Sequence, residues 1–497
     1  MTRPSTLAIF LVGAVLVAVG PAWAATYVVQ PNGSGDYPTI AAALAAAQSG
    51  DVIQLGSGTF IGTGNRDLSF GGKAVTVTSM AANAGAVVID VQGSAATPHR
   101  AFSFTSGETN AATLSHVTVR GGYISPGGGA IHIDGSSPTL DSCVFESNSA
   151  HGGGAVWVYN GADPVIIDCH FVDNQCTGQN GGALLIGQAS DPYVEGCLFS
   201  GNTSAAFGGA VLCYTGSQPT FVDCDFLDNV APSTGGAVYL GWDSHAEFDG
   251  CLFAGNESVL GGGAVRCYEN SDPLFMSSTF YANTGEYGGA FYVTDTSHPF
   301  LENCIVAFSL VGEAVHLANG GQATLSCCDL YGNQGGDWVG ELSNQFGVAG
   351  NFSSDPMFCD AESYDCSLQE NSPCTPTNNP GCGLIGSGEV GCGTQGVADE
   401  PVPSAILRTY AMPNPARSGV EIHYELADGA STAPRIAIYD PTGRLVRTLE
   451  PGTPGAGERK ATWDGRDDEG RQVEEGVYFY RVRLGDEVVS RHLVMLR

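Results

Sequence analysis

Short apolar runs, broken by glycine and small polar residues, repeat along the middle of this chain. The phrase Gly-Gly-Ala-apolar recurs about every 27 residues, with its alanine at positions 130, 155, 183, 210, 237, 264 and 290 and a weaker copy at 314. The runs are rich in β-branched and aromatic residues, which is typical of short strands joined by turns. No repeat unit contains a run long enough for a helix. Stacked units of this length predict a solenoid with one continuous core.

A second phrase, Cys-x-Phe-x-x-Asn, runs in step with the first. Its asparagine lies at positions 148, 174, 202, 229, 256, 283 and 333, and its cysteine at positions 143, 169, 197, 224, 251, 304 and 328, with Ser278 in one further copy. Each unit therefore predicts one coil of a right-handed parallel β-helix, with equivalent residues of adjacent coils about 4.8 Å apart. We expect the asparagines to form an interior ladder. The cysteine column forms either buried thiols or disulfides; thiols are favoured because stacked side chains run parallel rather than converging.

Side-chain alternation assigns the two faces of the strand that follows each Gly-Gly-Ala. The first and third residues after the alanine are apolar in the successive copies and should point into the core. The second and fourth should point outward, and they form a column rich in aromatic residues. Aromatic faces on a flat sheet suit sugar rings, although aromatics also favour strands and pack on one another across them. The predicted ligand-binding strip consists of Trp157, Tyr159, Tyr214, Tyr239, Tyr268 and Tyr292.

The two ends of the chain have different compositions. Residues 1–24 contain Arg3, an apolar stretch and Ala22-Trp23-Ala24, a pattern typical of a cleaved secretory signal peptide; a transmembrane anchor is the alternative, disfavoured by the short apolar run. The mature chain should therefore be exported, to the outer-membrane surface or the extracellular space, with no transmembrane segment. We expect the β-helix over 25–393, with an N-terminal helical cap within 27–55, the clearest repeats at 127–333 and a cysteine-rich end at 355–393. A proline-rich linker at 394–404 precedes a C-terminal domain at 405–497.

Charge supports this division and narrows the range of partners. The whole chain carries 51 acidic and 19 basic residues. Only five basic residues, against 36 acidic ones, fall between positions 25 and 399, so this part carries about −31, whereas the remainder is nearly balanced. Such a surface repels phosphate backbones, which excludes nucleic acid as a partner. The acid excess either binds calcium on outer turns or serves solubility; the sequence contains no EF-hand or nonapeptide calcium repeat.

Two stretches resemble known families. The paired Gly-Gly-Ala and Phe-x-x-Asn phrases, from Gly128 to about Asn283 with a weaker tail to Asn333, resemble the repeats of chlamydial polymorphic membrane proteins, within the pectate-lyase-like right-handed β-helix class. The stretch from Met412 to Arg497 resembles the immunoglobulin-like domain of flagellar hook-capping proteins and the C-terminal sorting domains of type IX secretion. It carries Asn-Pro, Trp-Asp-Gly and Gly-Val-Tyr-Phe-Tyr phrases between alternating strands, as in a small β-sandwich. The resemblance implies contact with export or anchoring machinery, and a passive spacer is the alternative.

A further set of cysteines lies in a stretch rich in glycine, proline and asparagine, which is too poor in apolar residues to form a core. We read this stretch as a disulfide-stapled end of the β-helix. Since the set has five members, one is either free or reaches back to Cys327 or Cys328. A zinc site is the alternative, but no tight Cys-x-x-Cys pair supports it. The disulfide candidates are Cys359, Cys366, Cys374, Cys382 and Cys392.

Three classes of function remain open. Pectate lyases of the class use acidic residues to hold calcium and an arginine as base, and Arg266 with Glu269 and Asp295 are the candidates for such a polysaccharide lyase or glycosidase. A purely structural surface rod is a second alternative. We favour non-catalytic recognition or adhesion, with a polysaccharide or cell-surface glycan as ligand. Neither a nucleophilic-serine motif nor a phosphate-binding loop or HExxH motif occurs.

Overall fold

The computed structural model describes residues 24–392, 406–412, 416, 419–426, 434–439, 445–449, 457–468, 470–473, 476–484 and 487–495. Nearly all of the expected signal peptide and the expected linker at 394–404 lie outside the described residues. The chain divides into two compact units, one formed by 1–357, 361–366 and 372–388 and the other by 358–360, 367–371 and 389–497. None of the helices among the described residues is long and apolar enough to cross a membrane.

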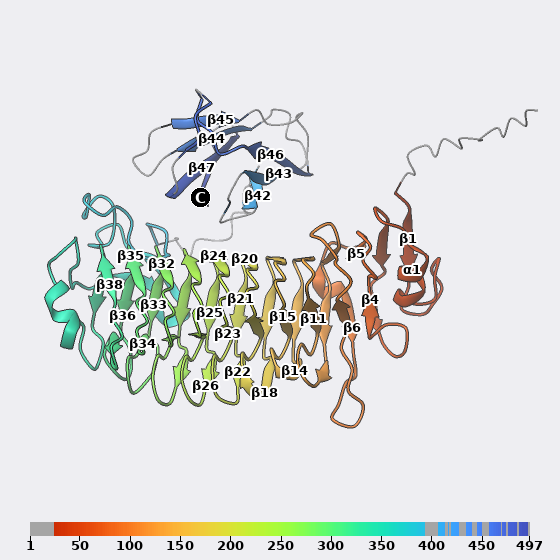
Figure 1. Cartoon of the computed structure of the whole chain (residues 1–497), viewed down its shortest axis with the longest axis horizontal. Coiled ribbons are helices and arrows are strands. Elements are labelled where there is room, and N and C mark those ends of the chain that lie inside the picture. Colours follow the sequence, from red (N-terminus) through yellow and green to blue (C-terminus); the bar gives the residue numbers. More distant parts are fainter. Residues whose placement is uncertain are drawn as a thin grey trace, which may run out of the picture. The chain divides into compact units, whose positions relative to one another are not determined.

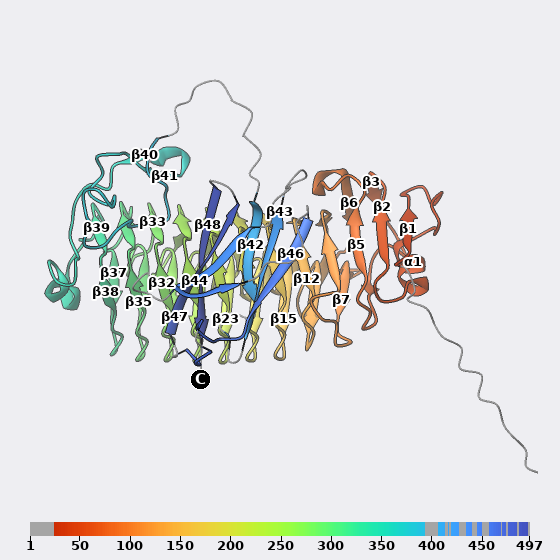
Figure 2. The same cartoon turned by 90° about the horizontal axis from the view of Figure 1, so that it is seen from above.

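The first unit is a parallel β-helix whose coils stack side by side, as Figures 1 and 2 show. A typical coil visits four sheets in the order A, B, D and C before it returns to sheet A. Sheet A consists of β1 (Thr26–Val29), β2 (Val52–Leu55), β5 (Thr76–Ser79), β8 (Thr113–Ser115), β12 (Thr139–Asp141), β16 (Val165–Ile167), β20 (Tyr193–Glu195), β24 (Thr220–Val222), β28 (Glu247–Asp249), β32 (Leu274–Met276), β35 (Phe300–Glu302) and β38 (Thr324–Ser326).

The other three sheets follow the same stacking. Sheet B consists of β3 (Gly58–Phe60), β6 (Val87–Asp90), β9 (Thr118–Arg120), β13 (Val144–Glu146), β17 (His170–Val172), β21 (Leu198–Ser200), β25 (Asp225–Leu227), β29 (Leu252–Ala254), β33 (Thr279–Tyr281), β36 (Ile305–Ala307) and β39 (Asp329–Tyr331). Sheet C consists of β4 (Leu68–Ser69), β7 (Phe102–Phe104), β11 (Ile131–Asp134), β15 (Val156–Tyr159), β19 (Leu184–Gly187), β23 (Val211–Tyr214), β27 (Val238–Gly241), β31 (Val265–Cys267), β34 (Phe291–Val293) and β37 (Val315–Leu317). Sheet D consists of β10 (Tyr123–Ile124), β14 (Ser149–Gly152), β18 (Gln175–Asn180), β22 (Thr203–Ser204), β26 (Val230–Ala231) and β30 (Glu257–Ser258).

The Gly-Gly-Ala phrase forms the corner between sheets D and C. Its first glycine has left-handed backbone, for example φ +62° at Gly181 and +58° at Gly208, which favours glycine. Its second glycine lies against the next coil: a Cβ on Gly182 would stand 1.8 Å from the carbonyl oxygen of Gly209. The alanine that follows is fully buried in each of these copies. The phrase thus recurs because each of its three positions has no room for a larger side chain or needs an unusual backbone angle.

The second phrase places its cysteine, phenylalanine and asparagine inside the coil. A residue with left-handed backbone precedes the cysteine, such as Asp168 (φ +50°) or Asp223 (φ +49°), and this corner separates sheet A from sheet B. Because of this corner, Leu140 of sheet A and Phe145 of sheet B both point inward although they lie an odd number of positions apart. The cysteines of the column are buried thiols, and Ser278 replaces one of them with its hydroxyl accepting a hydrogen bond from the backbone N–H of Cys251 at 3.2 Å.

The asparagines form a ladder inside the corner between sheets B and D. Asn202 donates from Nδ2 to Oδ1 of Asn229 at 3.0 Å and to the carbonyl oxygen of Phe171 at 2.8 Å. Its own Oδ1 accepts hydrogen bonds from the backbone N–H and the Nδ2 of Asn174. The same pattern links Asn148 through Asn283 without a gap. Each buried amide therefore ties three neighbouring coils together, with the desolvation of its polar atoms offset by hydrogen bonds.

Two different devices close the ends of the β-helix. At the N-terminal end, α1 (Ile40–Ala46) buries Ile40, Ala43 and Leu44 against the first coils, and the Thr39 hydroxyl caps it. At the C-terminal end, the 3-10 helix η2 (Gly340–Gln345) buries Leu342 in the core cluster. Two further short 3-10 helices, η1 (Ala84–Ala86) and η3 (Ala361–Ser363), lie outside the sheets. Strands β40 (Phe358–Asp360) and β41 (Asp365–Leu368) pair with each other.

The cysteines of the C-terminal stretch are only partly cross-linked. Cys327 bonds to Cys382, and Cys359 bonds to Cys392. The expectation that Cys366 and Cys374 also form disulfides is not met, because both are buried thiols. The Cys374 thiol donates a hydrogen bond to Oδ2 of the buried Asp329 at 3.3 Å, so it contacts a carboxyl group rather than another sulfur.

The buried Asp329 should make stability depend on pH. Burial raises the pKa of Asp329 to about 7, although the Ser354 N–H and the Cys374 thiol donate hydrogen bonds to it. The carboxyl of the unfolded chain ionises near pH 4. The free energy of unfolding should therefore fall by about 2–4 kcal/mol as the pH rises from about 4 to about 7. Outside this range the pH should have little effect through Asp329. Melting temperatures across this range should fall in the native protein and stay flatter in Asp329→Asn. Glu257→Gln, an exposed acid, is the control; equal slopes in all three proteins would assign the pH dependence to other groups.

The second unit contains two antiparallel sheets. One consists of β42 (Ile406–Met412), β43 (Val420–Leu426) and β46 (Gly457–Trp463), and the other of β45 (Leu445–Leu449), β44 (Arg435–Tyr439), β47 (Gly476–Leu484) and β48 (Glu487–Met495). Tyr424 and Trp463 from the first sheet and Ile438 and Tyr480 from the second share one buried cluster. The unit is therefore a small β-sandwich built on its own core.

Candidate functional site

The outward face of sheet C holds the residues that the sequence singled out for binding. Parallel pairing in register aligns Trp157 with Leu185 and Leu212, and the same column continues through Tyr239, Arg266 and Tyr292. The column is not uniformly exposed. Leu185, Leu212 and Tyr239 form a second, smaller hydrophobic cluster, against which Trp157, Phe207, Tyr214 and Tyr268 pack.

Tyr239 corrects the prediction of a continuous exposed strip. It is only 4% exposed, because the ring of Phe207, from the corner between sheets D and C, lies 5.0 Å from its ring. Alternation fixes the side of the strand from which a residue projects, but it does not show which neighbouring turn covers that residue. Trp157, Tyr159, Tyr214, Tyr268 and Tyr292 remain half-buried.

Trp242 is the most prominent residue that the sequence-based prediction missed. It is 42% exposed and lies on the turn after β27. Its ring lies 5.9 Å from Tyr239, 5.9 Å from Tyr268 and 6.4 Å from Tyr214, at steep angles to the last two. We call Tyr214, Tyr239, Trp242 and Tyr268 the aromatic patch. Burial raises the pKa of Tyr214 to about 12, so its hydroxyl stays neutral at physiological pH and can both donate and accept hydrogen bonds.

The backbone of Trp242 is unusual for so large a residue. Its φ is +56°, in the left-handed region. The equivalent turn position in other coils has the same backbone but carries Gln188, Thr215, Glu269 or Asp295. A bulky residue in this conformation costs on the order of 1 kcal/mol or more. The sequence alone shows a tryptophan at a turn position that carries polar residues in other coils. It does not show the backbone angle that makes this tryptophan unusual.

Trp157 forms a separate contact at the N-terminal side of the same sheet. Its ring stacks on His132 at 4.9 Å and lies 5.2 Å from Tyr159. Burial lowers the pKa of His132 to about 4, with a further contribution from the Arg100 cation, so the stacked imidazole is neutral. The indole Nε1 of Trp157 is buried and has no hydrogen-bond partner among the described residues.

Arg266 is held as a structural group. It is 6% exposed, and its guanidinium donates to the carbonyl oxygens of Cys267 and Tyr292 at 2.8 and 3.0 Å. It also donates to the Thr294 hydroxyl, and its guanidinium carbon lies 4.1 Å from the ring centre of Tyr292 and 5.2 Å from that of Tyr268. The guanidinium is thus enclosed between two rings, and both of its terminal nitrogens donate hydrogen bonds. In this state it cannot serve as the exposed base considered from sequence.

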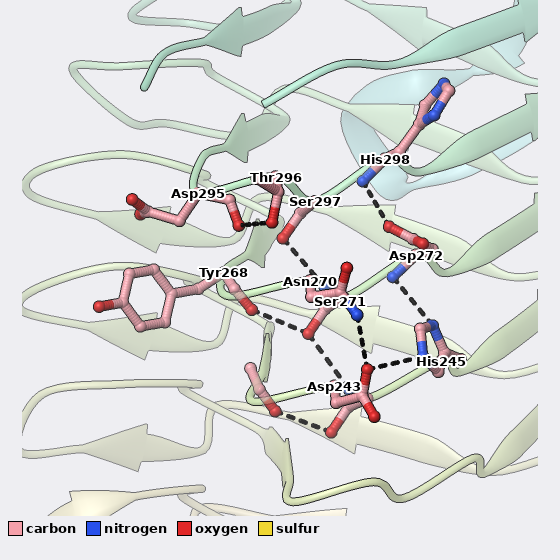
Figure 3. A network of polar contacts seen from close by, with 12 residues as sticks. Asp243, His245, Tyr268, Asn270, Ser271, Asp272, Asp295, Thr296, Ser297 and His298 are labelled. Atoms are coloured by element: carbon pink, nitrogen blue, oxygen red, sulfur yellow. Dashed lines mark hydrogen bonds and ion pairs between the residues drawn. The ribbon is translucent and has the colours of Figure 1, made fainter. Parts of the chain in front are cut away.

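The two acidic candidates lie beside the patch on stacked turns. A hydrogen bond to Glu269 raises the pKa of the Tyr268 hydroxyl, and Asp295 accepts a hydrogen bond from Thr294 at 2.5 Å. Figure 3 shows the side chains of Tyr268 and Asp295 on the same side of these turns. Asp295 is therefore linked to Arg266 through Thr294 rather than by a direct ion pair.

The same turns carry a polar network on their other side (Figure 3). Asn270 donates to Asp243 at 2.6 Å, and the backbone N–H of Asp272 donates to Nδ1 of His245 at 3.2 Å. The backbone N–H of His298 donates to Asp272 at 2.7 Å. These contacts link each turn to the next. Within the described part of the chain, no group of three or more His, Cys, Asp or Glu side chains is arranged to hold a metal ion.

Two family models match this chain, and one curated protein and one solved structure are similar to it. Residues 103–259 and 230–353 match the family model described as a right-handed beta helix region, and residues 415–486 match the FlgD Ig-like domain. Metabotropic glutamate receptor-like protein R of Dictyostelium discoideum is 30% identical over 77 residues, which cover 16% of this chain and only 5% of that protein. A solved structure described as the complex structure of XylC with xylose covers 94% of this chain and 100% of its own, at 9% identity and a TM-score of 0.37.

The family matches agree with the structure in both units. The two β-helix matches together span half of the chain, from residue 103 to residue 353. They coincide with the coils whose glycine corners and asparagine ladder are described above. The chain belongs to the right-handed β-helix family.

Proposed function

We propose that this chain is an exported, surface-associated protein that recognises glycans through the aromatic patch without cleaving them. The main support for this proposal is the position of Trp242, which is exposed at the centre of three tyrosine rings. The equivalent turns of neighbouring coils have the same left-handed backbone but carry smaller or polar side chains, so only this coil presents a large aromatic ring at the turn. An exposed tryptophan ring among three tyrosines is best accounted for by a contact that it makes with a ligand.

The chemistry around Trp242 suits an uncharged sugar. Aromatic faces bind the apolar C–H face of a sugar ring, while neutral tyrosine hydroxyls and nearby carboxylates pair with its hydroxyl groups. The charge of about −31 between residues 25 and 399 disfavours a polyanionic glycan. The engagement of Arg266 with backbone carbonyls supports binding over cleavage.

The experiment separates strain from binding at one position. Trp242→Gly should weaken retention on a glycan matrix at least tenfold. Its melting temperature should change only modestly, because glycine relieves the strain at φ +56° but loses the ring contacts and adds backbone entropy to the unfolded chain. Gln188→Gly, at the equivalent turn with φ +53°, is the matched control and should retain full binding. Retention would be measured by affinity electrophoresis over a panel of polysaccharides. If Trp242→Gly were retained as strongly as the native protein, the aromatic patch would be excluded as the binding site.

We also propose that the FlgD-like domain attaches the β-helix to the cell surface or directs its export. The proposal rests on the family match over 415–486 and on a core separate from that of the coils. Deleting residues 405–497 and following the β-helix through cell fractions tests this role. An unchanged distribution would favour a passive spacer.

A further inference from the structure

The outward column that contains Tyr159, Tyr214 and Tyr268 has a period of two coils. Gly187 and Gly241 occupy the same column in the intervening coils, because Gly187 pairs in register with Tyr214 and Tyr214 pairs with Gly241. The backbone N–H of Tyr268 bonds to Leu240, which continues the register. The tyrosines therefore recur at two strand spacings, about 9.6 Å along the axis of the β-helix.

The glycines of this column leave space that neighbouring aromatic rings occupy. A Cβ on Gly187 would stand 2.3 Å from Cε1 of Tyr214, so the tyrosine ring occupies the space that a side chain would fill. A Cβ on Gly241 would stand 2.8 Å from Cε1 of Tyr239. Glycine in a strand interior weakens the strand, and here each glycine makes room for a neighbouring ring. The column thus holds three half-buried tyrosines, here called platforms, and one coil that carries glycine separates each from the next.

We propose that this column binds an extended, neutral, β-1,4-linked glycan. The glycan would lie along the axis of the β-helix, with one tyrosine under every second sugar. This inference rests on the proposed function and assigns its ligand class. In such a chain successive sugars are turned over, so only alternate rings present the same face to a flat surface. A step of two coils matches that alternation. A charged polymer is disfavoured by the acidic β-helix, as argued above.

Trp242 fits this arrangement as the contact between two platforms. It follows Gly241 directly and lies near both Tyr214 and Tyr268, at 6.4 and 5.9 Å between ring centres. Glu269 and Asp295, on the turns beside Tyr268, place carboxylate acceptors for sugar hydroxyls at one edge of the column. The three tyrosines span four coil spacings, about 19 Å, so they lie under the first, third and fifth of five successive sugars.

The test is the dependence of affinity on chain length. Neutral β-1,4-linked glucan, mannan and xylan oligosaccharides of about two to about eight sugars would be titrated by calorimetry against the full mature chain. For at least one series, affinity should rise roughly three- to tenfold with every second sugar and level off near five sugars. Tyr159→Ala should remove one step, and Gly187→Ala, which displaces the Tyr214 ring, should remove the middle one. Tyr331→Ala, a half-buried tyrosine of sheet B, should change nothing.

The outcomes separate this inference from the proposed function. Binding that depends on Trp242 but grows smoothly with length, or that is equal for α-1,4-linked glucan oligosaccharides, would overturn the two-coil register and leave glycan recognition standing. Absence of binding to every neutral and charged glycan tested would overturn both.

Discussion

Replacing Gly182 by alanine should destabilise the β-helix by about 3–5 kcal/mol, among the largest effects of any single substitution in the chain. The added methyl would lie 1.8 Å from the carbonyl oxygen of Gly209 and 2.7 Å from that of Thr203. Both are backbone atoms of the next coil, so relief requires adjacent coils to separate rather than a side chain to rotate. The urea midpoint and the rate of limited proteolysis measure the loss.

A matched glycine controls for the change in backbone entropy. Gly381 has no atom within 4 Å of its ideal Cβ and no left-handed backbone angle, so Gly381→Ala should leave stability unchanged or raise it slightly. A Gly182→Ala protein as stable as Gly381→Ala would show that the coils are farther apart than the structure places them.

Replacing Asn202 by alanine should cost a similar amount through hydrogen bonds instead of a clash. The change leaves the backbone N–H and Nδ2 of Asn174 and the carbonyl oxygen of Phe171 without their partner in a fully buried corner. Each unsatisfied buried group costs about 1–3 kcal/mol, so the three groups together should cost at least about 3 kcal/mol. Since stacked coils interact mainly with neighbours, hydrogen exchange should increase first in the coils on either side of Asn202.

Two comparison variants identify the amide as the cause. Asn202→Asp keeps the size and the acceptor oxygen but cannot donate to Phe171, so it should be destabilised as well, and more strongly at neutral than at acid pH. Asn110→Ala, at an exposed site, should be neutral. If Asn202→Ala were as stable as Asn110→Ala, the ladder would contribute little to coil stacking.

The repeated parts of the fold could be predicted because the same local constraint acts on every repeat and selects the same residues each time. Gly-Gly-Ala recurs since a Cβ has no room at Gly182 or its equivalents, and the asparagine recurs since Asn202 satisfies polar groups in three coils. A single copy of either phrase would have meant little. Their common period was sufficient to predict a parallel β-helix.

The site was less predictable because its properties depend on neighbouring coils. Tyr239 has the parity of an outward residue, but Phe207 from another coil covers it. Trp242 lay outside the predicted strip because a turn position gives no side-chain direction until its left-handed backbone is known. The pairing of the cysteines likewise could not be predicted, because it depends on distances between sulfur atoms in the folded chain. Cys374 contacts Asp329, whereas Cys327 bonds to Cys382, 55 residues away in the sequence.

The most direct test of the proposed function is a polysaccharide panel assayed for both retention and cleavage. The native mature chain and Trp242→Gly would be compared on the same matrices, and new reducing or unsaturated ends would be measured alongside binding. We expect the native protein to be retained by a neutral glycan with no new chain ends, and Trp242→Gly to be released. New chain ends that persist with the native protein, or equal retention of both proteins, would contradict non-catalytic recognition through the aromatic patch.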